Sequence, residues 1–150
     1  MTVETLQPIL NEFALGDDEL RLALLLDYAN KLPEIPDRLE AERDAGLNRV
    51  PECMTPVFLW VEPTDHETLR LFIDVAEEAP TVQGLMSIIV RAYDDQPAAA
   101  IADMPQDLLQ QLQLDRAIRM QRAVGFSGIV GRIRKAAAAH LNGHAEENAP

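Results

Sequence analysis

The chain has 150 residues, a formal net charge of −12 and 47% hydrophobic residues, which fits one globular domain with a sizeable core. The negative charge argues against nucleic acid as a partner, because its phosphates would be repelled. No apolar run approaches the roughly 18 residues that a membrane-spanning helix needs. The start of the chain, residues 1–4, lacks the basic and apolar parts of a signal peptide. We therefore expect a cytoplasmic protein that spans no membrane.

Two helices are predicted before residue 33. Apolar residues recur at helical spacing between residues 3 and 13, and Gly16 interrupts that pattern. Asp17 and Asp18 then suit the start of a second helix, which should stop before Leu32-Pro33. In the polar segment that follows, the only element we predict is a short strand near residues 47–50.

The single cysteine, Cys53, lies between Pro51 and Pro56. Each proline fixes its own φ, lacks a backbone donor and favours an extended residue before it, so this segment cannot be helical. It leads into residues 57–61, a β-branched and aromatic run typical of a buried strand. We expect Cys53 on a stiff loop that a partner can reach. One cysteine excludes an internal disulfide and fits a reducing compartment.

The second half of the chain predicts an α+β domain. Strands are expected over residues 57–62 and 68–75, the latter with a clean period of two. A core helix follows Pro80, two short helical pieces begin at Pro97 and Pro105, and a last helix ends at Asn142-Gly143. Helices should therefore pack on a small antiparallel sheet within one domain, residues 1–141, and residues 142–150 should form a loose tail.

Basic residues gather near the C-terminus. Such a cluster is either a docking face or a solvated helix surface, and the second interpretation is favoured. The members are Arg116, Arg119, Arg122, Arg132, Arg134 and Lys135.

Histidines at positions 140 and 144 have metal-ligand spacing. However, the only further ligand nearby is Glu147, so we expect a solvated pair and no metal. One thiol is also too few to hold an iron–sulfur cluster.

Several short segments, in this order and spacing, resemble the SufE family. Its members are sulfur-acceptor proteins that work beside a cysteine desulfurase in iron–sulfur cluster assembly. The resemblance covers roughly residues 17–140. The segments that carry it are Lys31-Leu32-Pro33-Glu34, Cys53-Met54-Thr55, Val82-Gln83-Gly84-Leu85, Arg122-Ala123-Val124-Gly125 and Arg132-Ile133-Arg134-Lys135-Ala136.

The resemblance implies a fold and a reaction. The fold would be a two-layer domain of helices on a three-stranded antiparallel sheet, similar to the cluster scaffold proteins. Cys53 would take sulfane sulfur from a PLP-dependent desulfurase as a persulfide, with no cofactor of its own, and pass it to a downstream acceptor or scaffold. The family's conserved arginine falls on Arg122 and its conserved aspartate on Glu78. Many members have glycine and glutamine where this chain has Glu52 and Met54.

Sulfur transfer requires a thiolate, because the anion attacks the terminal sulfur of a persulfide. The neighbouring Glu52 disfavours that charge, so a cation must come from elsewhere in the fold. Our candidate is Arg122, which we expect to face Cys53 in the transfer complex. Glu78 has either a functional role or only that of a carboxylate at a helix N-terminus.

Two other functions stay open at this point. The protein could be a docking or regulatory partner that stimulates a desulfurase without carrying sulfur. It could also be a thiol enzyme such as a peroxidase, although the chain has no resolving cysteine. We favour a sulfur-transfer accessory protein over a stand-alone enzyme.

Overall fold

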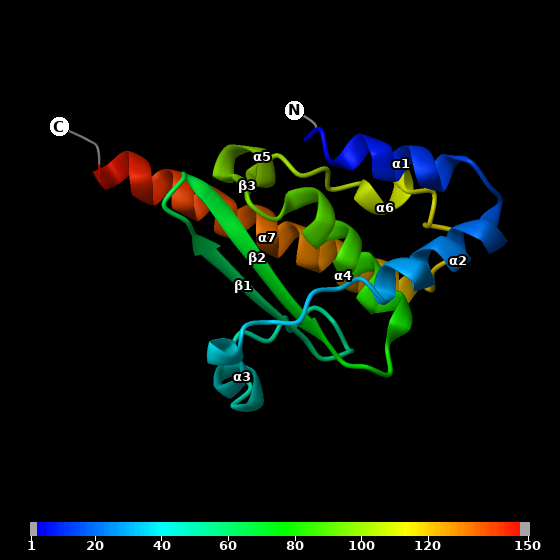
Figure 1. Cartoon of the computed structure of the whole chain (residues 1–150), viewed down its shortest axis with the longest axis horizontal. Helices are drawn as coiled ribbons and strands as arrows, with labels where there is room; N and C mark the ends of the chain where they lie inside the picture. The colour runs from blue at the N-terminus through cyan, green and yellow to red at the C-terminus, as the bar shows by residue number, and fades with distance from the viewer. Residues whose placement is uncertain (1–2, 148–150) are drawn as a thin grey trace.

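Figure 1 shows the computed structural model, which describes residues 3–147 and the side chains of residues 3–142. Helices and strands follow one another along the chain in a mixed order. The elements are α1 (Leu6–Ala14), α2 (Asp18–Ala29), α3 (Asp37–Asp44), β1 (Val57–Pro63), β2 (Thr68–Val75), α4 (Pro80–Tyr93), β3 (Gln96–Pro97), α5 (Ala98–Ala102), α6 (Leu108–Gln111) and α7 (Met120–Glu147).

The three strands form one antiparallel sheet in the order β1-β2-β3. β1 and β2 pair along their whole length, from Val57 opposite Val75 to Pro63 opposite Leu69. The period of two in β2 is confirmed, because every second side chain from Leu69 to Val75 is buried. The predicted fold class, helices on a three-stranded antiparallel sheet, is therefore confirmed.

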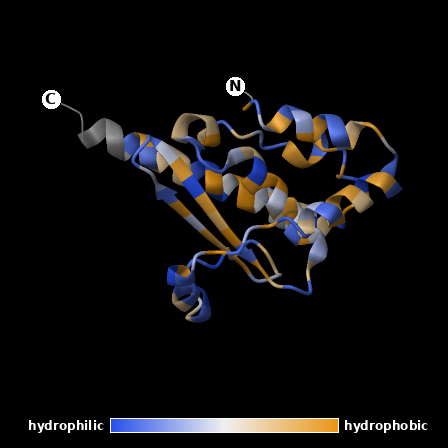
Figure 2. Ribbon diagram, viewed as in Figure 1, coloured by the Kyte–Doolittle hydropathy of each residue, from blue (hydrophilic) through white to orange (hydrophobic). Residues whose placement is uncertain are grey.

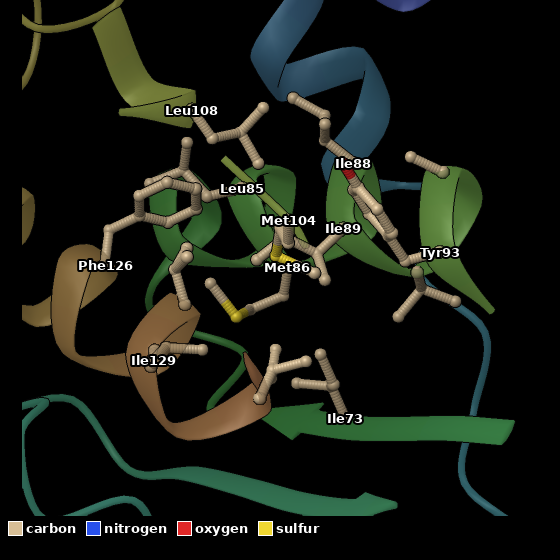
Figure 3. Packing of buried hydrophobic residues seen from close by; sticks show 14 of the residues in the cluster. Ile73, Leu85, Met86, Ile88, Ile89, Tyr93, Met104, Leu108, Phe126 and Ile129 are labelled. Carbon is tan, nitrogen blue, oxygen red and sulfur yellow. The ribbon is translucent and has the colours of Figure 1, made fainter. Parts of the chain in front are cut away.

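The main core lies between the sheet and the helices. α4 packs against β2 on one side and α2 on the other, while α7 lies against β1 and α5. Figure 3 shows Met86 of α4 and Ile129 of α7 meeting above Ile73 of β2, with Met104 and Phe126 closing the cluster. Because α4 is buried on almost every side, its sequence is apolar well beyond a single stripe.

A smaller apolar cluster covers the opposite face of the sheet. It consists of Ile35, Leu39 and Trp60, with Phe58 and Phe72 packed against it. Leu39 belongs to α3, which Figure 1 shows set apart from the other helices and Figure 2 shows as mostly hydrophilic. The sequence did not predict α3, because a single buried residue in eight leaves no apolar periodicity to detect.

The ends of the predicted helices agree with the structure in part. Asp17 caps α2 as expected, since its carboxylate accepts the Leu20 N–H at 3.0 Å. α7 instead continues through Asn142 and Gly143 to Glu147, so the predicted stop there is wrong. Asn and Gly cost a helix only about 1 kcal/mol each or less, which flanking helix formers offset. The predicted domain limits stay a prediction, and residues 148–150 lie outside the described residues.

The helices of the described part of the chain are too short or too polar to cross a membrane.

Candidate functional site

The loop that carries Cys53 is closed at its base by backbone hydrogen bonds. Val50 N–H donates to Val57 C=O at 2.8 Å, and Leu59 N–H donates to Asn48 C=O at 3.0 Å. These bonds join the segment before the loop to the outer edge of β1, where Arg49 forms an isolated antiparallel bridge with Phe58. The short strand predicted near residues 47–50 is thus reduced to this bridge. These hydrogen bonds therefore hold both ends of the loop, residues 51–56, in place.

The thiol of Cys53 points inward. The residue is only 9% exposed and belongs to the main core, whereas Met54 beside it is 82% exposed. α7 covers the thiol with a glycine: a Cβ built on Gly125 would lie 3.6 Å from the Cys53 sulfur. The sequence predicted a thiol that a partner can reach, and in this conformation that prediction is wrong. The thiol thus lies directly against α7, at ordinary contact distance from the position that a Cβ would take at Gly125.

The surroundings hold Cys53 in its neutral form. Burial raises the pKa of the Cys53 thiol, and a backbone hydrogen bond from Thr55 and the positive charge of Arg49 only partly oppose this. The Arg49 guanidinium also donates to Met54 C=O at 3.5 Å. Sequence reasoning missed Arg49, although a basic residue four positions before the cysteine, on the segment that closes the loop, was an available signal.

Arg122 and Glu78 lie on the same end of the molecule as Cys53. Arg122 is exposed in the first turn of α7, three residues before Gly125, and its side chain bonds to no other described residue. Glu78 is exposed in the turn before α4, and that turn meets the loop where Ala76 N–H donates to Pro56 C=O at 3.3 Å. The structure brings these segments together without joining the three side chains. Their roles therefore stay predictions.

The carboxylate of Glu52 is held by α7. The guanidinium of Arg132 donates to both of its oxygens, Nε at 3.1 Å and Nη2 at 2.6 Å. This bond holds the pKa of Glu52 below its usual value. The sequence suggested that Glu52 acts only as a repulsive charge next to the thiol, whereas here Arg132 balances that charge.

Exposed apolar side chains surround the covered thiol. One of them is Met54 in the loop itself. The others are Met120 and Val124 in the first turns of α7, which are 78% and 62% exposed. Two exposed arginines lie beside them, Arg119 directly before α7 and Arg122 in its first turn. Large apolar groups next to fixed positive charge are typical of surfaces that bind another protein.

A cavity of about 400 Å³ lies next to the loop, along the outer edge of β1. Its walls include Arg49, Arg132 and His140. Within the described residues, no three side chains of His, Cys, Asp or Glu come together as metal ligands would. The side chain of His144, the possible companion of His140, lies outside the described residues.

Comparisons with known proteins agree with this fold. A solution structure of a hypothetical protein from Thermus thermophilus matches with a TM-score of 0.80 and 27% identity, over 95% of this chain and 99% of that one. The family model described as "Fe-S metabolism associated domain" matches residues 7–137, which associates the chain with iron–sulfur metabolism. The chain belongs to the SufE family.

Two relatives extend this result. An uncharacterised SufE-like protein of Mycobacterium tuberculosis is 36% identical over 130 residues, covering 87% of this chain and 89% of the relative. An uncharacterised SufE-like protein of Rhizobium etli is 27% identical over 136 residues, covering 89% of each. Both matches cover nearly the whole chain, so the family likeness is a property of the entire fold.

Proposed function

We propose that this protein accepts sulfane sulfur on Cys53 from a PLP-dependent cysteine desulfurase, stimulates that enzyme, and passes the sulfur on for iron–sulfur cluster assembly in the cytoplasm. The observation that carries the proposal is the placement of the only thiol. It lies on a loop with fixed ends, bordered by exposed apolar and cationic side chains that suit a protein partner. Family membership supplies the link to iron–sulfur metabolism.

The transfer step exchanges one sulfur–sulfur bond for another. The Cys53 thiolate attacks the terminal sulfur of a persulfide on the desulfurase, and a new bond forms between the two sulfurs. The old bond breaks, and the desulfurase cysteine leaves as a thiolate that carries the electron pair. The sulfur atom keeps its oxidation state, so no external oxidant or reductant is needed. A second attack, by a thiolate of the downstream acceptor or scaffold, releases the sulfur from Cys53 in the same way.

The resting protein is not ready for this reaction. Cys53 is covered by α7, and burial raises its pKa, so the partner must expose the thiol and favour its anion. Arg49 already lowers the pKa, and Arg122 is exposed nearby to add a second positive charge in the complex. Glu78 would contribute a carboxylate to the same docking surface. Uncovering the thiol only in the complex would keep the persulfide from reacting elsewhere.

Intact mass measurement tests the proposal directly. The protein is incubated with a cysteine desulfurase and cysteine, and a mass increase of one sulfur atom at Cys53 is expected, reversed by a thiol reductant. Cys53→Ser serves as the control: it should bind the desulfurase normally but gain no mass and give no stimulation. Unchanged mass of the native protein, with the desulfurase active, would refute the carrier role.

The covered thiol favours a second candidate, a docking partner that stimulates the desulfurase without taking sulfur. The same Cys53→Ser variant separates the two functions. A docking partner would keep its full stimulation when the thiol is replaced, whereas a carrier would lose it.

A further inference from the structure

The residue before the thiol is fastened to a helix that begins far along the chain. Glu52 and Arg132 are 80 positions apart, yet they form a two-point ion pair. Their side chains remain 36% and 43% exposed, respectively, so the pair is accessible to water. Salt bridges of this kind are weak and reversible, although a guanidinium that meets a carboxylate through two bonds is the most favourable form.

α7 is shaped to receive the loop beneath that pair. Gly125, Gly128 and Arg132 follow at helical spacings of three and four, so they share one face of α7. Cys53 lies over Gly125, and Glu52 lies over Gly128 so closely that a Cβ there would be 2.6 Å from its own Cβ. The Glu52–Arg132 pair fastens the loop at the end of this glycine face.

We propose that Glu52 and Arg132 are positioning residues: their ion pair holds the Cys53 loop closed on α7, and its release exposes the thiol. The inference rests on the proposed role of Cys53 as a sulfur carrier. When the pair separates, what still holds the loop to α7 is its packing over Gly125 and Gly128, since the hydrogen bond from Arg49 to Met54 C=O is long at 3.5 Å and does not involve α7. A half-exposed pair of this kind changes an opening equilibrium by up to about fivefold.

The position of Arg132 indicates what opens the pair. Besides binding Glu52, Arg132 lines the cavity of about 400 Å³ at the outer edge of β1, together with Arg49. Of the acids in that cavity, Glu62 is paired with Arg38 and Glu42 accepts a long bond from Asn48, 3.4 Å. A carboxylate of the desulfurase that enters the cavity would compete with Glu52 for the guanidinium of Arg132, and small ions should weaken the pair in the same way.

Alkylation of Cys53 tests this inference without a desulfurase. Modification by neutral iodoacetamide and by anionic iodoacetate is followed by intact mass. We expect Glu52→Gln and Arg132→Gln each to accelerate the iodoacetamide reaction up to about fivefold. The charge-swapped double variant, E52R with R132E, should return it to the native rate. Added salt should accelerate the native protein and leave Glu52→Gln unchanged.

The ratio of the two reagents separates an ion pair from simple loss of packing. Glu52→Gln frees the guanidinium of Arg132 and leaves an extra positive charge near the loop, so the rate with anionic iodoacetate should rise more than the rate with iodoacetamide. Arg132→Gln frees the carboxylate of Glu52 and should reverse that preference. Arg134→Gln is the control, because Arg134 bonds to Ala102 C=O and Gln106 on another face of α7. It should behave as the native protein.

Two results would overturn the inference. One is alkylation of both single variants at the native rate, which would show that the pair does not hold the loop. The other is acceleration with no rescue by the charge swap and no change in reagent preference, which would assign the effect to packing alone. If the rates behave as expected and Cys53 still gains no sulfur from a desulfurase, the carrier role fails and the positioning role stands.

Discussion

Gly128→Ala should loosen the Cys53 loop without harming the helix. The added Cβ would lie 2.6 Å from the Glu52 Cβ and 2.8 Å from its Cγ, about 1 Å inside ordinary carbon contact. Overpacking of this kind costs about 1–3 kcal/mol. Alanine also stabilises the helix by about 0.8–1 kcal/mol relative to glycine, but α7 is helical whether the loop is open or closed. The stabilisation of the helix by alanine is therefore the same in the open and the closed state. Only the clash with Glu52 changes the equilibrium between them.

The measurement is the rate of Cys53 alkylation by iodoacetamide. If 1–2 kcal/mol of the clash is released on opening, the rate should rise about five- to thirtyfold. Gly131→Ala is the matched control, since its nearest neighbour would be Gln106 Oε1 at 3.8 Å. It should leave the rate unchanged and raise the free energy of unfolding in urea by about 0.8–1 kcal/mol. A Gly128→Ala protein that reacts at the native rate would refute the claim that α7 covers the thiol through this contact.

Three further outcomes follow from the structure. Arg49→Gln should raise the pKa of Cys53 further and slow its alkylation below that pKa, and a pH profile that coincides with the native one would contradict this. Gly84→Ala would place a Cβ 2.3 Å from a carbonyl oxygen of α2, so we expect a loss of about 3 kcal/mol or more in urea unfolding; native stability would be evidence against the contact. Burial raises the pKa of both Tyr28 and Tyr93 to about 12, so the folded state keeps protons that the unfolded state releases near pH 10, and stability should fall between about pH 10 and 12. Tyrosinate absorbance that appears near pH 10 in the folded protein would count against this last prediction.

The fold could be predicted wherever apolar periodicity was strong. The alternation from Leu69 to Val75 buries one face of β2, and the apolar residues of α4 recur at helical spacing, so the period determines each element. α3 was missed because Leu39 is its single buried residue, and its other contacts with the sheet are made by charged side chains, Arg38 with Glu62 and Arg43 with Asp74. β3 could not be located either, since its two residues, Gln96 and Pro97, are too few to show a pattern. They pair with β2 because they follow the end of α4, which packs on that strand.

The candidate site was predictable in its position and not in its orientation. Two prolines and a following strand place Cys53 on a loop, as the structure confirms. The burial of its thiol depends on α7, where Gly125, 72 positions later, packs against the Cys53 loop. Likewise, Glu52 has a partner only because the loop and Arg132 meet in the fold. Such contacts between distant segments are invisible to local sequence patterns.

Trp60 is the only tryptophan of the chain, and its position decides what fluorescence will report. It lies in the small cluster with Ile35 and Leu39, apart from the main core. α3 has eight residues, too few to be stable without that cluster, so it should detach at lower urea concentration than the rest unfolds. The unfolding transition measured by tryptophan emission should therefore occur at a lower urea concentration than the transition measured by circular dichroism. A two-state fit to emission alone would then measure the release of α3 and underestimate the stability of the chain.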